Sequence, residues 1–359
     1  MADTTRRARR VLLSGYYGFA NAGDEAVLAG LILSLRAADP SIEVTALSIN
    51  PAETERTHGV RAVHRYRPHA LLPALARTDL LLSGGGSLLQ DVTSAHGILY
   101  YLGVVRLAQR MGKRTMFGAQ GLGPLERVRS RRLVASVANR LDAITVRDPQ
   151  SAALLREIGV THPPIQVAAD PALLLGPDTF HAPQPGTYGV ALRPWRGQES
   201  LATRLADACR EALPQAHPVL FPMQPQTDTG VGEQFASLLH QGQRADRVLP
   251  EAGLAALTQA MGEREMMVGM RLHALILAAA AGVPSVALSY DPKVTAFMAQ
   301  SGQEDAVCDL SQDTEAALPA LLSRCWIARA ERAEALRSRL PALRAMAGRT
   351  AEAAVSLLK

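Results

Sequence analysis

The sequence predicts an α/β fold in which two Rossmann-like domains face each other across a cleft. Short apolar segments of the kind that form buried strands alternate with longer segments that carry apolar residues at helical spacing. Such alternation is typical of parallel sheets with helices on both faces. It breaks once, between Leu175 and Gly186, where proline and glycine are frequent, and it restarts at Tyr188. A chain of 359 residues is long enough for two domains.

The expected strands and helices follow one another along the chain. In the first half the strands are Val11–Ser14, Val44–Ile49, Leu80–Ser83, Thr115–Gly118, Ala143–Val146 and Ile165–Ala168, and the helices are Asp24–Ala37, Ile98–Met111, Ser130–Leu141 and Pro149–Ile158. In the second half the strands are Tyr188–Leu192, Val219–Pro222, Met266–Val268 and Ser285–Leu288, and the helices are Ser200–Leu213, Gly232–Leu239, Ala252–Met261, Leu272–Ala281 and most of 314–358. This order predicts an N-terminal domain over residues 1–178, a C-terminal domain over 186–325 and a helical tail over 326–359.

Charge and cysteine usage argue against several classes of protein. The formal net charge of +5 is spread along the sequence without a basic stripe interleaved with aromatic residues, so no nucleic-acid partner is expected. Three scattered cysteines, with no CxxC, HExxH or DxD motif, argue against a bound metal. No apolar run reaches the roughly 18 to 20 residues that span a bilayer, and the apolar stretch after the basic N-terminal residues is too short for a signal peptide. We therefore expect a cytoplasmic protein, and its basic surface is compatible with peripheral contact with the inner face of the cell membrane.

A glycine-rich loop follows the first predicted strand and opens the first predicted helix, from Gly15 to Glu25. Its spacing is not that of a dinucleotide-binding GxGxxG turn. Asn21 or Asp24 is a suitable helix cap, and Asp24 and Glu25 suit the positive end of a helix. Alternatively, Asn21, Asp24 and Glu25 bind the hydroxyl groups of a sugar, and one carboxylate removes a hydroxyl proton. Two carboxylates disfavour an anionic ligand, so the loop suits an acceptor better than a nucleotide.

Two further glycine-rich segments end predicted strands, at 83–91 and at 118–124. The three glycines of the first segment suit either a tight structural turn or close approach of the backbone to a ligand or a neighbouring strand. Gln90 and Gln120 lie in these segments and are candidate ligands for acceptor hydroxyl groups. Asp148 and Asp170 end the next two strands, each directly before a proline, which is typical of helix starts and turns.

In the second half, the ends of three predicted strands carry basic residues. Arg193 follows the first strand, Arg271 and His273 lie where a helix begins after another, and Lys293 follows a third. The first turn of a helix has unpaired N–H groups and a positive dipole, and arginine grips phosphate or carboxylate with two hydrogen bonds. This pattern predicts an anion site, although a core histidine and a surface ion pair are the simpler interpretations of His273 and Arg271. Lys293 is a third candidate anion ligand.

Several of these segments together resemble the polysaccharide pyruvyl transferase family, specifically its CsaB type. The resemblance runs from about Val11 to about Lys293, and the segments that carry it are GYYGFANAGDEAVL, DLLLSGGGSLLQD, GAQGLGP, TVRD, GMRLHALILAAAAGVP and SYDPKV. It implies a GT-B-like fold and transfer of pyruvate from phosphoenolpyruvate, a co-substrate, to a sugar as a cyclic ketal. In the CsaB type the acceptor is N-acetylmannosamine of a secondary cell-wall polymer that can anchor S-layer homology domains. The family's donor site corresponds here to Arg193, Arg271, Leu272 and His273, with Leu272 expected to contribute its backbone N–H.

The resemblance suggests roles for the candidate residues. Arg193 and Arg271 are expected to hold the two anionic groups of phosphoenolpyruvate, His273 to protonate it or to bind its phosphate, and Asp24 or Glu25 to act as the base. The acceptor is expected to be a sugar or a lipid-linked saccharide. The alternatives are a GT-B glycosyltransferase or sugar-nucleotide epimerase, and a non-catalytic glycan-binding protein on the same fold.

Overall fold

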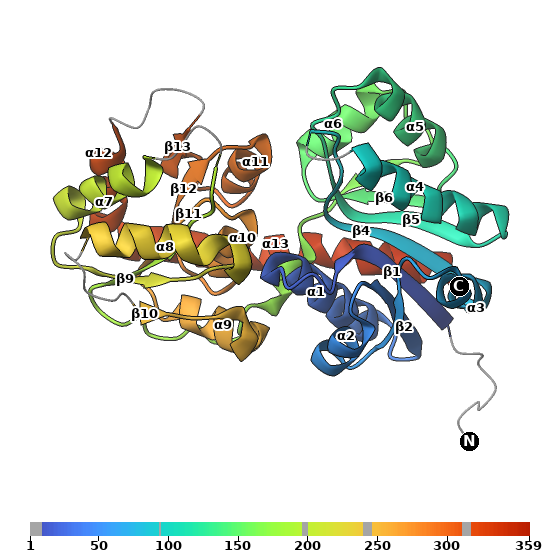
Figure 1. Cartoon of the computed structure of the whole chain (residues 1–359), viewed down its shortest axis with the longest axis horizontal. Helices are drawn as coiled ribbons and strands as arrows, with labels where there is room; N and C mark the ends of the chain where they lie inside the picture. Colours follow the sequence, from blue (N-terminus) through green and yellow to red (C-terminus); the bar gives the residue numbers. More distant parts are fainter. Residues whose placement is uncertain (1–8, 93–94, 196–199, 240–245, 311–316) are drawn as a thin grey trace. The chain divides into compact units, whose positions relative to one another are not determined.

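A computed structural model describes residues 9–92, 95–195, 200–239, 246–310 and 317–359 (Figure 1). The chain forms two compact units. The first comprises the residues up to Phe19, Val27–Leu174 and Arg344–Lys359, and the second comprises Ala20–Ala26 and Leu175–Leu343. The chain thus crosses to the second unit close to the predicted limit at 178, and the predicted tail 326–359 is shared between the two units. The domain limits given above stay a prediction.

The first unit contains a seven-stranded parallel sheet in the order β3-β2-β1-β4-β5-β6-β7. Its strands are β1 (Arg9–Tyr17), β2 (Ile42–Ser48), β3 (Arg61–His64), β4 (Leu80–Leu89), β5 (Arg114–Leu122), β6 (Ala143–Val146) and β7 (Ile165–Val167). Its helices are α1 (Ala22–Ala38), α2 (Pro51–His58), α3 (Pro68–Arg77), α4 (Ala95–Arg110), α5 (Val128–Ala138) and α6 (Pro149–Glu157), and the short 3-10 helix η1 (Pro171–Leu175) follows β7. The strand order reverses between β1 and β4, and in such sheets ligands bind outside the carboxyl ends of the strands at this point.

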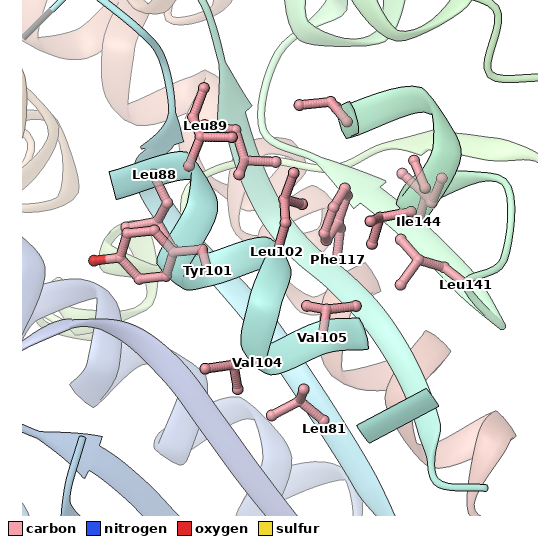
Figure 2. Packing of buried hydrophobic residues seen from close by; sticks show 14 of the residues in the cluster. Leu81, Leu88, Leu89, Tyr101, Leu102, Val104, Val105, Phe117, Leu141 and Ile144 are labelled. Carbon is pink, nitrogen blue, oxygen red and sulfur yellow. The ribbon is translucent and has the colours of Figure 1, made fainter. Parts of the chain in front are cut away.

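Apolar side chains cover both faces of this sheet. Figure 2 shows Leu102 and Val105 of α4 beside Phe117 of β5, within a fully buried cluster on the face covered by α4, α5 and α6. On the other face the buried side chains come from α1, from alternate strand positions and from the end of the chain, including Ala351 and Ala354. The C-terminal residues therefore complete the core of the first unit.

Glycines allow two central strands of the first unit to approach closely. Gly84 pairs with Gly118 in the β4–β5 ladder and has a φ of +159°. A Cβ atom built at Gly84 would lie 2.0 Å from the carbonyl oxygen of Gly118. Most of the glycine-rich segment at 83–91 thus continues strand β4, which ends later than predicted, and Gly84 makes the close approach to a neighbouring strand that the glycines suggested.

The second unit contains a six-stranded parallel sheet in the order β10-β9-β8-β11-β12-β13. Its strands are β8 (Thr187–Ala191), β9 (His217–Leu220), β10 (Asp246–Arg247), β11 (Met266–Gly269), β12 (Ser285–Ser289) and β13 (Val307–Asp309). Its helices are α7 (Leu201–Ala212), α8 (Pro225–Leu239), α9 (Leu254–Gly262), α10 (Leu272–Ala280), α11 (Pro292–Gln300) and α12 (Leu318–Ile327), with 3-10 helices η2 (Pro250–Ala252) and η3 (Glu304–Ala306); α13 (Arg329–Leu357) begins here and ends in the first unit.

The prediction of two α/β units with parallel sheets is confirmed. Among the strands and α-helices, the elements that the pattern did not predict are β3, β10, β13, α2, α3 and α11. Strand β3 is typical of them, because its four residues lie at the edge of the sheet and none is buried, so no apolar run marks it. Within the described residues, no helix is long and apolar enough to cross a membrane.

Candidate active site

The strand register of the second unit brings the predicted donor residues to one edge of the sheet. Ala191 of β8 pairs with Gly269 of β11, which in turn pairs with Ala287 of β12. Arg193 and Arg271 each follow their paired residue by two positions, and the loop after β12 carries Tyr290 and Lys293. Parallel strands end at the same edge, so three strands that are far apart in sequence place these side chains in one region.

Among the described residues of this region, Arg193 is a cation without a carboxylate partner. Its Nη1 donates to the hydroxyl of Tyr290 at 3.1 Å, and its guanidinium lies 5.2 Å from the centre of the Tyr290 ring and 5.8 Å from that of Trp195. Its Nε is buried without an acceptor, and among the described residues Arg193 forms no ion pair. An unfilled donor on a permanently charged, partly buried group favours an anionic ligand.

Lys293 is held beside the same tyrosine by the start of helix α11. Asp291 caps this helix by accepting from the backbone N–H of Lys293 at 3.1 Å, and its Oδ2 lies 3.0 Å from the Lys293 ammonium. The ammonium is also 5.8 Å from the centre of the Tyr290 ring. Lys293 and Arg193 therefore share one aromatic neighbour, but the charge of Lys293 is largely balanced by Asp291.

Arg271 is bound by a carboxylate from another helix. Its Nε donates to Oδ2 of Asp228 at 2.9 Å, its Nη2 donates to Oδ1 of Asp228, and the same Nη2 donates to the hydroxyl of Thr227 at 3.1 Å. The Asp228 side chain is fully buried and also accepts from the backbone N–H of Gln224 at 3.0 Å. This bidentate pair fixes the guanidinium and occupies the edge formed by Nε and Nη2, which leaves Nη1 for other contacts.

The first turn of helix α10 supplies the other part of the site. Arg271 is its N-cap residue, in an extended conformation, and Leu272 and His273 follow as the first helical residues. The N–H groups of a first turn have no partner inside the helix, so they suit an anion. The Leu272 side chain is buried, so the part of this residue that suits an anion is its backbone N–H.

The segment Ala20–Ala26, which belongs to the second unit, lies against His273. The backbone N–H of Ala22 donates to the carbonyl of Met223 at 2.9 Å. A Cβ atom built at Gly23 would lie 2.3 Å from Nδ1 of His273, so only glycine permits this approach. The candidate acid and the predicted acceptor loop are therefore neighbours in the structure.

The acceptor candidates in this loop have different surroundings. Asn21 caps helix α1, because its Oδ1 accepts from the backbone N–H of Gly23 at 3.0 Å. Asp24 and Glu25 lie in the first turn of α1 and are half-buried. The capping interpretation of Asn21 is thus realised, and the sugar-binding roles of Asn21, Asp24 and Glu25 stay predictions.

The glutamines predicted to bind the acceptor lie in the first unit and are placed differently. Gln120 is fully buried within β5, and its amide nitrogen donates to the carbonyls of Gly86 at 3.2 Å and Gly121 at 2.8 Å. Gln120 thus supports the glycine-rich strands through its amide nitrogen, while its Oε1 is buried without a donor among the described residues, and its role in acceptor binding stays a prediction. Gln90 is half-buried, and its Oε1 accepts from the backbone N–H of Val92 at 3.0 Å.

A buried polar network connects the carboxyl ends of four strands in the first unit. Arg147 donates to Oδ2 of Asp170 at 3.3 Å and to the hydroxyl of Ser87 at 2.7 Å, and its Nε lies 3.6 Å from Asp148. Asp148 caps helix α6, as its position before a proline suggested. The guanidinium also packs on Gly121, where a Cβ atom would lie 2.6 Å from its Nε. We interpret Arg147 as a residue that holds these loops in place.

Comparison with known proteins identifies the chain. A sequence model of the polysaccharide pyruvyl transferases matches residues 21–292, which is most of the chain. The protein belongs to the polysaccharide pyruvyl transferase family. It is also similar to the amylovoran biosynthesis protein AmsJ of Erwinia amylovora, with 20% identity over 84% of this chain and 88% of that protein. Both findings support pyruvyl transfer to a polysaccharide.

The fold of this pyruvyl transferase is shared with solved structures of low sequence identity. HepE of Anabaena, in complex with UDP and glucose, matches with a TM-score of 0.60 and 16% identity over 98% of this chain and 97% of that chain. UDP-GlcNAc 2-epimerase from Neisseria meningitidis, bound to UDP-GlcNAc, matches with a TM-score of 0.59 and 12% identity over 98% of this chain and 99% of that chain. These likenesses show the GT-B fold that the sequence predicts.

Sequence reasoning missed three residues of this pyruvyl transferase that shape the site. Asp228 and Tyr290 hold Arg271 and Arg193, and Gly23 makes room for His273. Tyr290 was visible as a polar residue at a strand end, but Asp228 carried no signal because it lies 43 positions before its partner. Among the described residues, no group of three or more His, Cys, Asp or Glu side chains is arranged to hold a metal ion.

Proposed function

We propose that the protein transfers pyruvate from phosphoenolpyruvate to two hydroxyl groups of one sugar, forming a cyclic ketal and releasing phosphate. The observation that carries this proposal is the anion-binding edge of the second unit. Arg193, whose Nε has no acceptor among the described residues, and the positive dipole end of helix α10 suit two anionic groups. Phosphoenolpyruvate carries a phosphate, through oxygen, and a carboxylate on the same carbon, C2, which suits two neighbouring anion-binding groups.

The reaction needs one acid and one base. Protonation of C3 of phosphoenolpyruvate converts the methylene to a methyl group and leaves oxocarbenium character at C2. A sugar hydroxyl loses its proton to a base and attacks C2. The bond from C2 to the phosphate oxygen then breaks, and a second hydroxyl closes the ketal. Of the two hydroxyl protons, one balances the proton added to C3 and the other leaves with phosphate.

His273 is the acid that we propose, and Asp24 or Glu25 the base. His273 lies in the first turn of α10, next to the first-turn N–H groups and in contact with Gly23. Asp24 and Glu25 follow that glycine directly in sequence. An acid and a base that meet the same substrate must lie within hydrogen-bond reach of it, and the position of this loop against His273 supports both roles.

We propose N-acetylmannosamine of a cell-wall polysaccharide precursor as the acceptor, free or lipid-linked, in the cytoplasm or at the inner face of the membrane. This part rests on the resemblance described above and on the family. Because HepE and the epimerase with the same fold bind UDP or UDP-sugars, a sugar-nucleotide enzyme is the alternative that experiments must separate.

The decisive experiment measures phosphate release from phosphoenolpyruvate with a panel of N-acetylhexosamine acceptors, followed by mass analysis of the product. We expect phosphate release that depends on the acceptor and a product that carries a pyruvate ketal. Phosphoenolpyruvate, but not a UDP-sugar, should raise the melting temperature. Stabilisation by UDP-sugars alone, without phosphate release, would favour the alternative.

The role of His273 is tested by His273→Ala, which should keep the fold and lose most of the phosphate release. His69→Ala, which removes an exposed histidine of α3, is the matched control. Turnover near that of the unmodified protein in His273→Ala would remove His273 from the mechanism. The base is tested by Asp24→Asn and Glu25→Gln, at least one of which should lower turnover at saturating acceptor.

A further inference from the structure

Aromatic side chains gather around one arginine in the first unit. Only 4% of the residues in the chain are aromatic. Nevertheless, the guanidinium carbon of Arg65 lies 4.3 Å to 5.3 Å from the ring centres of Phe19, Tyr66, Tyr100 and Tyr101. We call these four rings, together with Arg65, the aromatic cluster.

Arg65 is a buried cation without a carboxylate. It is 2% exposed, its Nη1 donates to the carbonyl of Gly15 at 2.9 Å, and its Nε is buried without an acceptor. Among the described residues it forms no ion pair. The faces of the surrounding rings therefore stabilise a charge that would otherwise be costly to bury.

The cluster lies at the carboxyl end of the sheet. Arg65 directly follows β3, Phe19 follows β1, and Tyr100 lies on α4, which follows β4. The hydroxyl of Tyr100 donates to the carbonyl of Arg65 at 3.1 Å, and burial raises the pKa of Tyr100, so this phenol keeps its proton at neutral pH. The cluster is thus a rigid, hydrogen-bonded part of the edge where α/β sheets bind ligands.

One ring of the cluster is open to solvent. Tyr66 is 55% exposed although it packs on Arg65 and meets Tyr100 edge-on, with ring centres 5.1 Å apart. A ring that served only to bury Arg65 would need one face, and the exposed fraction shows that much of Tyr66 remains uncovered. Elsewhere in the cluster, Phe19 is stacked by Tyr16, with ring centres 3.9 Å apart and an angle of 7° between the rings.

We propose that the aromatic cluster is a saccharide-binding subsite that holds a sugar unit of the acceptor by stacking on Tyr66. A pyranose ring presents C–H groups on its faces and hydroxyl groups at its edge. The exposed ring of Tyr66 matches the C–H faces of such a sugar. The unpaired charge of Arg65 polarises the rings and favours the oxygen-rich edge of a sugar over an apolar ligand. This inference rests on the proposed function, because it takes the saccharide to be the acceptor.

The proposal is tested by Tyr66→Ala, Tyr66→Phe and the control Val128→Ala, which removes an exposed apolar side chain of the same unit. The acceptors are N-acetylmannosamine and a disaccharide that contains it. Tyr66→Ala should raise the acceptor KM for the disaccharide by about 3- to 10-fold, with smaller change for the monosaccharide. Tyr66→Phe keeps the ring and should stay near the unmodified protein. The KM for phosphoenolpyruvate should not change in any of them.

A binding measurement that needs no turnover separates this inference from the proposed function. Saturation-transfer NMR of the unmodified protein with the disaccharide should show contact with the sugar, and Tyr66→Ala should weaken this signal while Val128→Ala keeps it. If phosphate release fails but this pattern holds, the subsite stands and the pyruvyl donor is wrong. An unchanged signal and KM in Tyr66→Ala, or an equal loss in Tyr66→Phe, would overturn the stacking subsite.

Discussion

Asp228 holds the guanidinium of Arg271 through two hydrogen bonds, one of them 2.9 Å between Nε and Oδ2. The carboxylate comes from the first turn of α8 and the arginine from the N-cap of α10, so the pair joins the loops after β9 and β11. This pair explains how the long, flexible side chain of Arg271 is held in place at the carboxyl edge of the second sheet. Because Asp228 neutralises Arg271, the net positive charge at this edge comes chiefly from Arg193, which has no carboxylate partner among the described residues.

Replacing Asp228 should disturb the site through Arg271. In Asp228→Asn the buried guanidinium loses its charged partner, and breaking such a pair typically costs about 3 kcal/mol or more. We expect a lower melting temperature and a KM for phosphoenolpyruvate raised by about 10-fold or more, because Arg271 is no longer held. Thr227→Val removes one hydrogen bond to the same nitrogen and should have a much smaller effect. Equal KM values in Asp228→Asn and the unmodified protein would show that Arg271 needs no such support.

Removing the unpaired cation should weaken donor binding directly. Hydrogen bonds to charged groups contribute about 1.5 to 3 kcal/mol, so Arg193→Met should raise the KM for phosphoenolpyruvate by about 10- to 100-fold. Arg193→Lys keeps the charge but not the planar guanidinium. Its KM for phosphoenolpyruvate should lie between those of the unmodified protein and Arg193→Met. The control is Arg210→Met, since Arg210 is an exposed arginine of α7 that pairs with Asp207. A donor KM that is insensitive to Arg193 would place the anion site elsewhere.

Two glycine substitutions in the first unit should change stability in opposite directions. The first tests the close approach of β4 and β5, and the second is its control in an open position. Gly84→Ala forces a Cβ atom against the Gly118 carbonyl and into a φ that disfavours side chains, so it should destabilise the fold by about 3 kcal/mol or more. Gly103→Ala adds a methyl group to an exposed position in helix α4 with open space around it, and should stabilise by about 0.5 to 1 kcal/mol. Urea unfolding measures both. A Gly84→Ala variant as stable as the unmodified protein would contradict the tight packing described here.

An ion pair near the end of the second unit predicts a pH-dependent contribution to stability. The hydrogen bonds from Arg332, both 2.8 Å, lower the pKa of Asp305 below its ordinary value of 3.8. A lowered folded pKa means that the stabilisation is complete well above pH 3.8 and is lost as the pH falls through the folded pKa. The carboxylate is more than half exposed, so we expect only about 0.5 kcal/mol.

The measurement compares the unmodified protein with Asp305→Asn by urea unfolding at several pH values. The difference in the free energy of unfolding should be present at pH 7 and shrink below about pH 4. Glu251→Gln, which changes an exposed carboxylate, is the control for a general charge effect. A difference that grows as the pH falls would have the wrong sign for this ion pair.

Much of the fold follows from local patterns that the sequence displays openly. The strands β1, β4 and β5 are marked by continuous apolar runs, and helix α4 is marked by apolar residues at helical spacing. Both patterns involve only residues that are close together in the sequence. The edge strand β3 and the short strand β10 were missed because none of their residues is buried and they carry no apolar run. The glycines of β4 indicated close approach to a ligand or to a neighbouring strand, but the sequence could not show that the partner is Gly118 of β5.

By itself, the sequence determined the class of fold, the strand ends that carry polar residues, and the family. Only the tertiary structure decided the partners of those residues. Arg193 meets Tyr290 across 97 positions of chain and Arg271 meets Asp228 across 43. These pairs depend on strand order and on side-chain packing between distant segments. Neither residue pair leaves a local pattern in the sequence. Residues that are far apart in the chain come into contact only when the sheet that carries them has formed.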